Sequence, residues 1–494
     1  MHLRCQRLTL LGLTMAGLLL AACAIPFGPR EAPPDPFTLF RPSLLPEAQA
    51  DLDNLKDAPV YHLIMRIDTA NRRVAGQARV TVPNTSRQEW KEVYFRLYPN
   101  LLQYSGIMTV DGVTVDDQAA AFTYDADDTA LRLILPSPLA PGRSAVVQIS
   151  YTLQAPRREV GYVLFGEGQG ILSLPVAYPV LAVYDEGGWH LDVVPSHADA
   201  AFSATSFYVV TATVPAGVVI APSGAVLTTV AGGDGTVSWH IVSGPAREFA
   251  LLLSTDYQVA STQAYSTTVT SYFLPGDREM GLMALEYAAA IVRAYSDHFG
   301  PYPYTYIHIA EAPLTYRGQE YPGLNLLGVD VYRDQRNSLE FLAAHEIAHQ
   351  WWYNLVNNDP ANTPWLDEGL AEYSTFFYYK ARFGEGVAET LRARRWAAPV
   401  EYAKGRGLDA VVGQPASAFK SNYEAMVYAK AALFFDALRT EVGEPIFLAA
   451  LREYIRRHRW GIVTPDDLLT SFIAVSGRDV RDLYQRWILS TGSP

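Results

Sequence analysis

The sequence contains little cysteine. Its 494 residues include two cysteines, Cys5 and Cys23, and both fall in the first 23 positions. The rest of the chain can therefore form no disulfide of its own and can offer no thiolate to a metal. Any transition-metal ion bound by the body of the protein must be held by histidine and carboxylate groups.

Basic residues are scarce relative to acidic ones. Lys and Arg number 39 against 51 Asp and Glu, which gives a formal net charge of -12. Binding to the phosphate backbone of nucleic acids needs basic surface, and so does electrostatic docking on anionic lipid. We therefore expect no nucleic-acid partner, and we expect any membrane attachment to be covalent.

The apolar run at the N-terminus is short. It extends from Leu8 to Leu20, follows Arg4 and Arg7, and is shorter than the roughly 20 residues of a membrane-spanning helix. Such a run is typical of a secretory signal peptide. It ends in Leu-Ala-Ala-Cys, which resembles a bacterial lipobox, where cleavage precedes a cysteine that is then acylated. We predict a signal peptide over 1–22 and a lipidated Cys23 that anchors the protein in the bilayer, on the extracytoplasmic side of the cell envelope. The alternative is an ordinary signal peptide with an incidental cysteine.

Residues 23–45 are rich in proline, which is typical of an extended tether. Beyond them the pattern changes. Between residues 74 and 82, apolar Val74, Ala78, Val80 and Val82 alternate with polar residues, which is the period of a half-buried strand. Similar runs occur at 94–97, 131–135, 145–151, 208–214, 237–242 and 249–254. We expect an all-β domain over residues 46–256.

Helical patterns dominate residues 257–494. Asp277 is placed to cap a helix that runs to Phe299 and ends at Gly300. Residues 305–309 read as a strand, and residues 464–488 read as two short capped helices. The expected fold class is therefore α+β and multidomain, with an N-terminal β domain followed by a mostly helical domain.

The sequence His345-Glu346-Ile347-Ala348-His349 has the pattern H-E-x-x-H. On a helix, residues four apart lie on one face, so His345 and His349 can bind one ion. Glu368, on a second predicted helix, supplies a third ligand. Two imidazoles and one carboxylate leave the fourth zinc position open to water, as in catalytic and not in structural sites. We predict one Zn²⁺ per chain, with Glu346 beside the ion as the general base.

The surroundings of this motif support two helices. Asn337 and Glu340 have capping-box spacing before the first helix, and Thr363 with Pro364 suits the start of the second. One turn beyond Glu368, Glu372 is placed to accept the outer ring N–H of a ligating histidine. The alternative is a chance H-E-x-x-H whose histidines only pack, and the downstream carboxylate disfavours it. His190 and His197 share no spacing with the motif and are expected to be structural.

These residues resemble a known family. His-Glu-Ile-Ala-His-Gln-Trp-Trp at 345–352 and Trp-Leu-Asp-Glu-Gly-Leu-Ala-Glu-Tyr at 365–373 are similar to the core of the gluzincin aminopeptidases, the family of aminopeptidase N and leukotriene hydrolase. The resemblance covers about residues 55–490. It implies a saddle-shaped N-terminal β domain, a thermolysin-like zinc-peptidase domain, and a member that lacks the large helical C-terminal domain of many relatives.

The resemblance also implies roles for two more residues. Gly318-Gln319-Glu320-Tyr321 resembles the family's Gly-x-Met-Glu-Asn segment, with Gln319 in place of Met and Tyr321 in place of Asn. Glu320 is thereby implied to bind the α-amine of the substrate. Val427-Tyr428-Ala429-Lys430 matches the family's Tyr-x-Lys, which implies that Tyr428 donates a hydrogen bond to the developing oxyanion. Tyr423 is the competing candidate.

The implied function is that of a zinc-dependent aminopeptidase, which removes N-terminal residues from peptides by attack of a metal-activated water. A zinc endopeptidase or a glycyl-type aminopeptidase would use the same scaffold without an amine-binding Glu320. Nothing in the residues selects for epoxide hydrolysis, a side activity of one branch of the family. A peptide-binding lipoprotein with weak or no activity is disfavoured, because the ligands, Glu346 and Tyr428 are all present.

Overall fold

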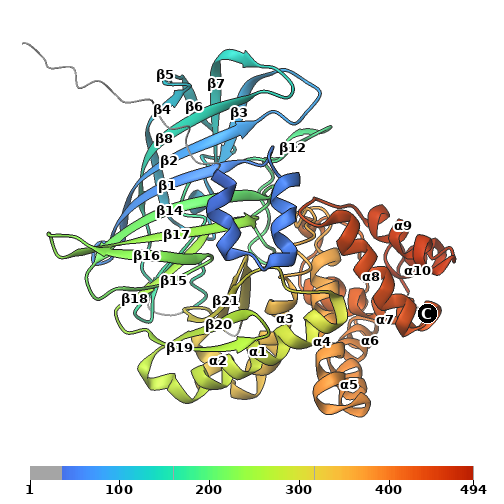
Figure 1. Cartoon of the computed structure of the whole chain (residues 1–494). Helices are drawn as coiled ribbons and strands as arrows, with labels where there is room; N and C mark the ends of the chain where they lie inside the picture. The colour runs from blue at the N-terminus through green and yellow to red at the C-terminus, as the bar shows by residue number, and fades with distance from the viewer. Residues whose placement is uncertain (1–35, 159–160, 316, 493–494) are drawn as a thin grey trace, which may run out of the picture.

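The first half of the described chain is built from strands. The computed structural model describes residues 36–158, 161–315 and 317–492, so the predicted signal peptide and Cys23 lie outside the described residues. The large sheet has the order β16-β17-β14-β1-β2-β8-β4-β5, in which β1 pairs with β14 in parallel (Figure 1). Its strands are β1 (Val60–Asp68), β2 (Arg73–Pro83), β4 (Ile107–Val115), β5 (Gln118–Ala119), β8 (Ser144–Gln154), β14 (Ser206–Pro215), β16 (Ala225–Ala231) and β17 (Thr236–Ala246).

Smaller sheets complete this half. One has the order β15-β18-β10-β9, one has the order β11-β3-β7-β6, and β12 pairs with β13. Their strands are β3 (Trp90–Arg96), β6 (Phe122–Asp125), β7 (Ala130–Leu139), β9 (Gly166–Gly168), β10 (Ile171–Pro175), β11 (Val180–Leu181), β12 (Tyr184–Asp185), β13 (Gly188–Trp189), β15 (Val219–Pro222) and β18 (Ala250–Ser254). The predicted strands coincide with β2, β3, β7, β8, β14, β17 and β18. In β2 buried and exposed side chains alternate along most of the strand, as its sequence pattern predicts.

A five-stranded sheet opens the second half, in the order β19-β20-β21-β23-β22. Its strands are β19 (Gln258–Ala264), β20 (Thr267–Phe273), β21 (Tyr306–Ala312), β22 (Gly318–Tyr321) and β23 (Leu324–Gly328). β22 forms one edge and pairs antiparallel with β23. Figure 1 shows the helices α1 and α2 against this sheet and the later helices gathered beyond it.

The helices account for most of the remaining chain. The α-helices are α1 (Arg278–Phe299), α2 (Val329–Arg333), α3 (Leu339–Ala348), α4 (Trp365–Phe383), α5 (Glu385–Leu391), α6 (Ala398–Gly405), α7 (Ala431–Val442), α8 (Glu444–His458), α9 (Pro465–Ser476) and α10 (Arg481–Trp487). The shorter or wider helical turns are η1 (Pro36–Ser43), η2 (Pro46–Asn54), η3 (Tyr98–Asn100), η4 (Pro275–Asp277), η5 (Arg336–Ser338), η6 (Arg392–Ala397), η7 (Ala416–Ala418) and η8 (Glu424–Lys430).

The predicted tether is wrong over residues 36–45. This stretch forms η1 and an isolated β-bridge from Leu44 to Tyr304, and Phe40 and Leu44 are buried in the core of the helical half. The ring of Phe40 lies 4.8 Å from that of Phe207, and Leu45 N–H donates to the Pro303 carbonyl. Proline content indicated an extended chain, but the apolar side chains between the prolines favour burial.

The helix starts differ in detail from the predicted caps. Ser338, not Asn337, precedes α3, and its side chain makes no capping hydrogen bond. The second helix begins after Pro364, while the Thr363 hydroxyl donates to the Asp359 carbonyl. Asp277 precedes α1 but pairs with Arg333 at 2.9 Å instead of capping. The first of the two capped helices predicted over residues 464–488 is α9, and it begins with a capping box between Thr464 and Asp467.

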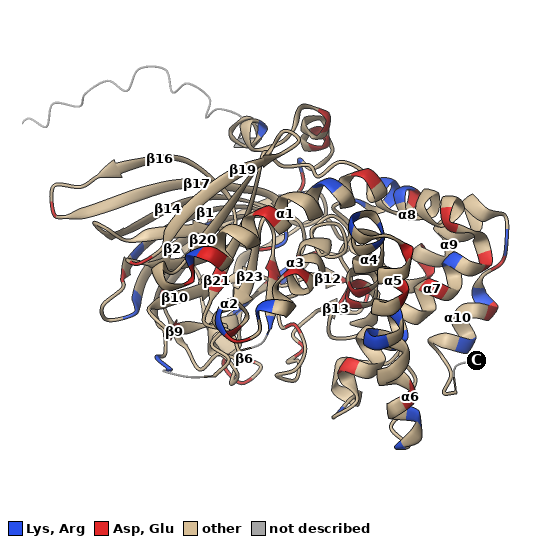
Figure 2. Ribbon diagram, turned by 90° about the horizontal axis from the view of Figure 1, so that it is seen from below, with Lys and Arg blue, Asp and Glu red and all other residues tan. Residues whose placement is uncertain are grey.

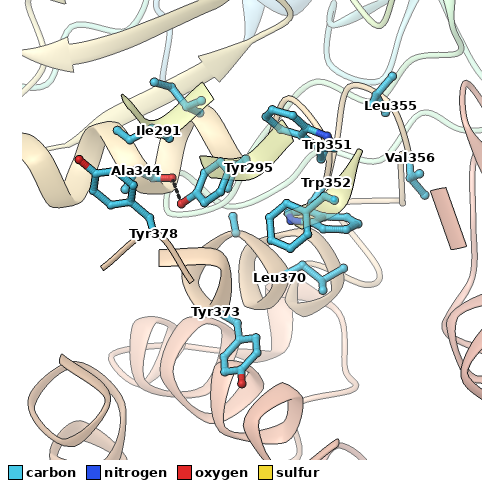
Figure 3. Packing of buried hydrophobic residues seen from close by; sticks show 14 of the residues in the cluster. Ile291, Tyr295, Ala344, Trp351, Trp352, Leu355, Val356, Leu370, Tyr373 and Tyr378 are labelled. Atoms are coloured by element: carbon cyan, nitrogen blue, oxygen red, sulfur yellow. Dashed lines mark hydrogen bonds between the residues drawn. The ribbon is translucent and has the colours of Figure 1, made fainter. Parts of the chain in front are cut away.

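An aromatic core holds α3 between α1 and α4 (Figure 3). The hydroxyl of Tyr295 on α1 donates to the Ala344 carbonyl of α3 at 2.7 Å. Just after α3, Trp351 and Trp352 are 1% exposed, and the Trp352 indole donates to Ser374 of α4 at 2.8 Å. Because these buried polar atoms have partners, the packing fixes α3 and α4 in one relative position.

Arg247 joins the two halves. Its side chain is 1% exposed and donates to three backbone carbonyls of the helical half, those of Tyr353, Asn354 and Gly461. Tyr353 and Asn354 lie four and five residues after His349, so this contact holds the chain just after β17 near the predicted zinc helix. Breaking it would leave a buried guanidinium unpaired, which is strongly unfavourable.

Charged residues of both signs are spread along the outer helices α5 to α10 (Figure 2). No helix within residues 36–158, 161–315 and 317–492 combines the length and the apolar character needed to cross a membrane. The observed order of an all-β part followed by a mostly helical part is that of the expected α+β fold class.

Candidate metal centre and active site

The three predicted ligands lie together. His345 is in the last turn of α3, His349 directly follows that helix, and Glu368 is in the first turn of α4. Nε2 of His345 lies 3.2 Å and Nε2 of His349 lies 3.3 Å from Glu368 Oε2, and the two Nε2 atoms are 3.3 Å apart. Atoms bound tetrahedrally to zinc at about 2.0–2.1 Å are separated by about 3.3–3.4 Å. The residues present therefore fit a zinc ion with one open position.

Outer contacts orient the ligands. His349 Nδ1 lies 3.0 Å from the Trp352 carbonyl, which leaves Nε2 free of its proton for a metal. His345 Nδ1 lies 3.1 Å from Oε2 of Glu372, its predicted partner, but the two atoms do not have the geometry of a hydrogen bond. Glu372 in turn accepts from the Trp396 indole at 2.9 Å.

The predicted ligands shift one another's pKa values. Although burial opposes it, contact with His345 and His349 lowers the pKa of Glu368. Burial also lowers the pKa of His345, but contact with Glu368 and Glu372 outweighs it and raises that pKa to about 10. Both shifts arise because Glu368 and Glu372 place negative charge around the histidine rings, which favours a cation there. A bound metal ion would take the place of the proton that this charge favours on His345.

Glu346 projects beside the ligands, buried to 5% exposure. Burial, with the charge of Glu320 added, raises the pKa of Glu346 to about 8. The backbone of β22 runs directly against it: a Cβ placed on Gly318 would lie 2.2 Å from Glu346 Oε1. Only a residue without a side chain can stand at that position while Glu346 keeps its place.

Glu320 lies on the edge strand β22. One carboxylate oxygen each from Glu320 and Glu346 and one ring nitrogen of His349 lie within 4.8 Å of one another. Burial, followed by the charge of Asp199, raises the pKa of Glu320 well above its ordinary value. A buried carboxylate so close to the metal seat is suited to hold a cation.

Tyr428 reaches the same centre from η8. Its hydroxyl donates to Glu368 Oε1 at 2.5 Å, and its ring stacks on His345 with centroids 5.6 Å apart. Burial and the charge of Glu368 raise the pKa of Tyr428 well above its ordinary value, so the hydroxyl stays a donor. The competing Tyr423 packs against His197 and Tyr428. Tyr428 lines the cavity over the ligands, whereas Tyr423 is not among its lining residues.

That cavity has a volume of about 1270 Å³ and is partly open to solvent. His345, His349, Glu346, Glu320 and Tyr428 all line it. His197 lines it too, but neither His197 nor His190 belongs to a metal-ligand group among the described residues. His190 lies elsewhere, 2.7 Å from Asp185.

The sequence did not predict that Asp199 lies at the site. It lies in the loop before β14 and lines the cavity, and its Oδ1 accepts from Gln319 Nε2 at 2.9 Å. The same Nε2 donates to Glu320 Oε2 at 3.0 Å. Gln319 therefore links a loop of the strand-rich half to the edge strand. The substitution of Gln for Met at this position was the available signal, but nothing in the sequence named its partner.

Residues 283–487 match the family model described as Peptidase family M1 domain. The chain is 24% identical over 261 residues to Aminopeptidase 2 of Candida albicans, a match covering 48% of this chain and 27% of that protein. It is 28% identical over 248 residues to the puromycin-sensitive aminopeptidase of Caenorhabditis elegans, covering 45% and 25%. The chain thus spans about a quarter of the length of these relatives.

A solved structure covers more of the chain. It is a mutant of an M1 zinc metallopeptidase from Deinococcus radiodurans, bound to a Tyr-Ser-Ala substrate. The TM-score is 0.65 at 19% identity, with 89% of this chain and 95% of that chain covered. This likeness confirms the expected fold class, an N-terminal β part followed by a mostly helical part.

Proposed function

We propose, from the match of residues 283–487 to the model described as Peptidase family M1 domain, that the protein is a zinc-dependent aminopeptidase. The observation that carries the proposal is the position of Glu320 beside Glu346 and His349. A carboxylate there can pair with the free α-amine of a peptide, which brings the first peptide bond, and no later one, to the metal seat.

The metal would be one zinc ion held by His345, His349 and Glu368. When bound, zinc supplies an activated water and polarises the scissile carbonyl. Glu346, buried beside the seat, accepts the proton of the attacking water and passes it to the leaving amine. Tyr428 turns its hydroxyl from Glu368 to the carbonyl oxygen as negative charge develops there, a contact typically worth about 3 kcal/mol. The Tyr-Ser-Ala peptide bound by the Deinococcus radiodurans relative supports peptides as substrates.

The zinc ligands and Glu346 are tested by separating metal content from turnover. Replacing His345 with Ala should remove zinc and activity together. Glu346→Gln should keep near-stoichiometric zinc, measured by elemental analysis, and lose turnover by several orders of magnitude. Substantial activity in Glu346→Gln would show that Glu346 is not the general base.

The amine-binding role is tested on one peptide with and without an N-acetyl cap. The wild type should cleave the free-amine form far faster, and Glu320→Ala should lose most of that advantage with zinc content unchanged. Equal cleavage of both forms by the wild type would identify an endopeptidase on the same scaffold. Zinc binding without cleavage of either form would favour a peptide-binding protein.

The proposal also covers the cellular location of the protein and its division into domains. We place the chain on the extracytoplasmic side of the cell envelope, anchored through an acylated Cys23 after removal of residues 1–22, with domains at 46–256 and 257–494. Cys23→Ser should abolish acylation and release the protein from membranes. A Cys23→Ser protein that still sediments with membranes after a high-salt wash would contradict the anchor.

A further inference from the structure

The cavity carries a second carboxylate at its amine-binding end. Asp199 is half-buried at the cavity wall, and its Oδ1 and Glu320 Oε2 accept from the same amide nitrogen of Gln319. With donor–acceptor distances of 2.9 and 3.0 Å, the two oxygens lie at most about 6 Å apart. No Lys or Arg among the described residues forms an ion pair with either carboxylate.

Negative charge is in surplus here. Besides Asp199 and Glu320, the buried carboxylates Glu346, Asp367 and Glu368 lie close by. Burial, followed by the charges of Glu368 and Asp367, raises the pKa of Asp199 to about 7. A divalent metal and a substrate α-ammonium would each offset part of this negative charge. A second cation on the substrate would reduce the surplus further.

The nearby walls suit the stem of a long cationic side chain. Tyr104 and Tyr162 line the same cavity, and the Tyr162 hydroxyl donates to Gln319 Oε1 at 3.4 Å. Aromatic faces contact the methylene groups and the charged head of arginine and lysine favourably. The arginines that line the cavity near this end are engaged elsewhere, Arg317 with Glu424 at 2.8 Å and Arg158 with Ser105 at 2.7 Å.

We propose that Asp199 is a specificity-determining residue that selects an N-terminal arginine or lysine, pairing with the side-chain cation while Glu320 holds the α-amine. This inference rests on the proposed aminopeptidase function. Gln319 acts as a positioning residue, because its amide holds the two carboxylates at a fixed separation.

The test compares arginine with citrulline, which has nearly the same shape and no charge. Aminoacyl-methylcoumarins of arginine, citrulline and leucine are the substrates. The wild type should show kcat/KM at least tenfold higher for arginine than for citrulline, because a charge-assisted pair is lost. Asp199→Asn should bring that ratio close to one and change leucine turnover less than threefold. Free L-arginine should also protect the wild type thermally better than L-citrulline does, and Asp199→Asn should abolish the difference.

Asp192→Asn is the matched control, since Asp192 lies in the same loop between β13 and β14 and its side chain is 62% exposed. It should leave the arginine-to-citrulline ratio unchanged. Equal cleavage of arginine and citrulline substrates by the wild type would overturn the inference and needs no variant. An equal loss on all three substrates in Asp199→Asn would also overturn it, since Asp199 would then hold the α-amine. If the zinc-loaded wild type cleaved none of the substrates, the proposed function itself would fail.

Discussion

Substituting alanine for Gly318 should disable Glu346 without touching a metal ligand. Gly318 opens the edge strand β22, and its backbone lies against the Glu346 side chain. An added methyl carbon would lie 2.2 Å from Oε1, 2.4 Å from Cδ and 2.5 Å from Cγ of Glu346. Ordinary van der Waals contact begins at 3.4 Å. The carboxylate must therefore move by about 1 Å, and a displacement of that size costs roughly 100-fold in rate.

The assay for Gly318→Ala pairs kcat on an aminoacyl-coumarin with zinc content. We expect kcat to fall about 100-fold while zinc stays near one per chain, because the three ligands lie on α3 and α4 and not on β22. Gly386→Ala is the matched control, since nothing lies within 4 Å of a Cβ at that position of α5. A kcat within threefold of the wild type would refute the reasoning. Loss of zinc together with activity would show that the clash acts on the ligands and not on Glu346.

Two further predictions follow from contacts outside the reacting atoms. Glu372→Gln should weaken zinc affinity about tenfold, because His345 loses its charged partner. Competition with a chelator measures the affinity. An unchanged affinity would mean that Glu372 does not support His345 as a ligand. Burial lowers the pKa of His308 to about 4, so the unfolded chain takes up a proton that the folded chain refuses as the pH falls below 6.5. His308 therefore costs stability at low pH, about 2 kcal/mol at pH 5 relative to pH 7, and His308→Gln should remove that part of the pH dependence in urea unfolding. The same pH dependence in both proteins would contradict this assignment.

Local patterns explain why much of the fold was predictable. The alternation in 74–82 depends only on neighbouring residues, and β2 occupies Arg73–Pro83. The predicted zinc ligands can also be recognised from residues close in the sequence, because His345 and His349 are one helical turn apart and Glu368 lies in the next helix, α4. Residues 36–45 could not be placed this way. Their prolines predict an extended chain, and their burial depends on a surface formed by residues far along the sequence.

Edge strand β22 marks the limit of prediction from the sequence. The resemblance to a family motif predicts the role of Glu320, but the roles of Gly318 and Gln319 become clear only in the folded structure. Gly318 must lack a side chain because Glu346, on another element, occupies that space. The amide of Gln319 meets Asp199, which is 120 residues away in the sequence. The metal ligands come from a short stretch of chain, whereas the groups that face the substrate are joined across the two halves. Zinc chemistry could therefore be predicted from a local motif, while the specificity of the cavity becomes visible only once distant loops are brought together.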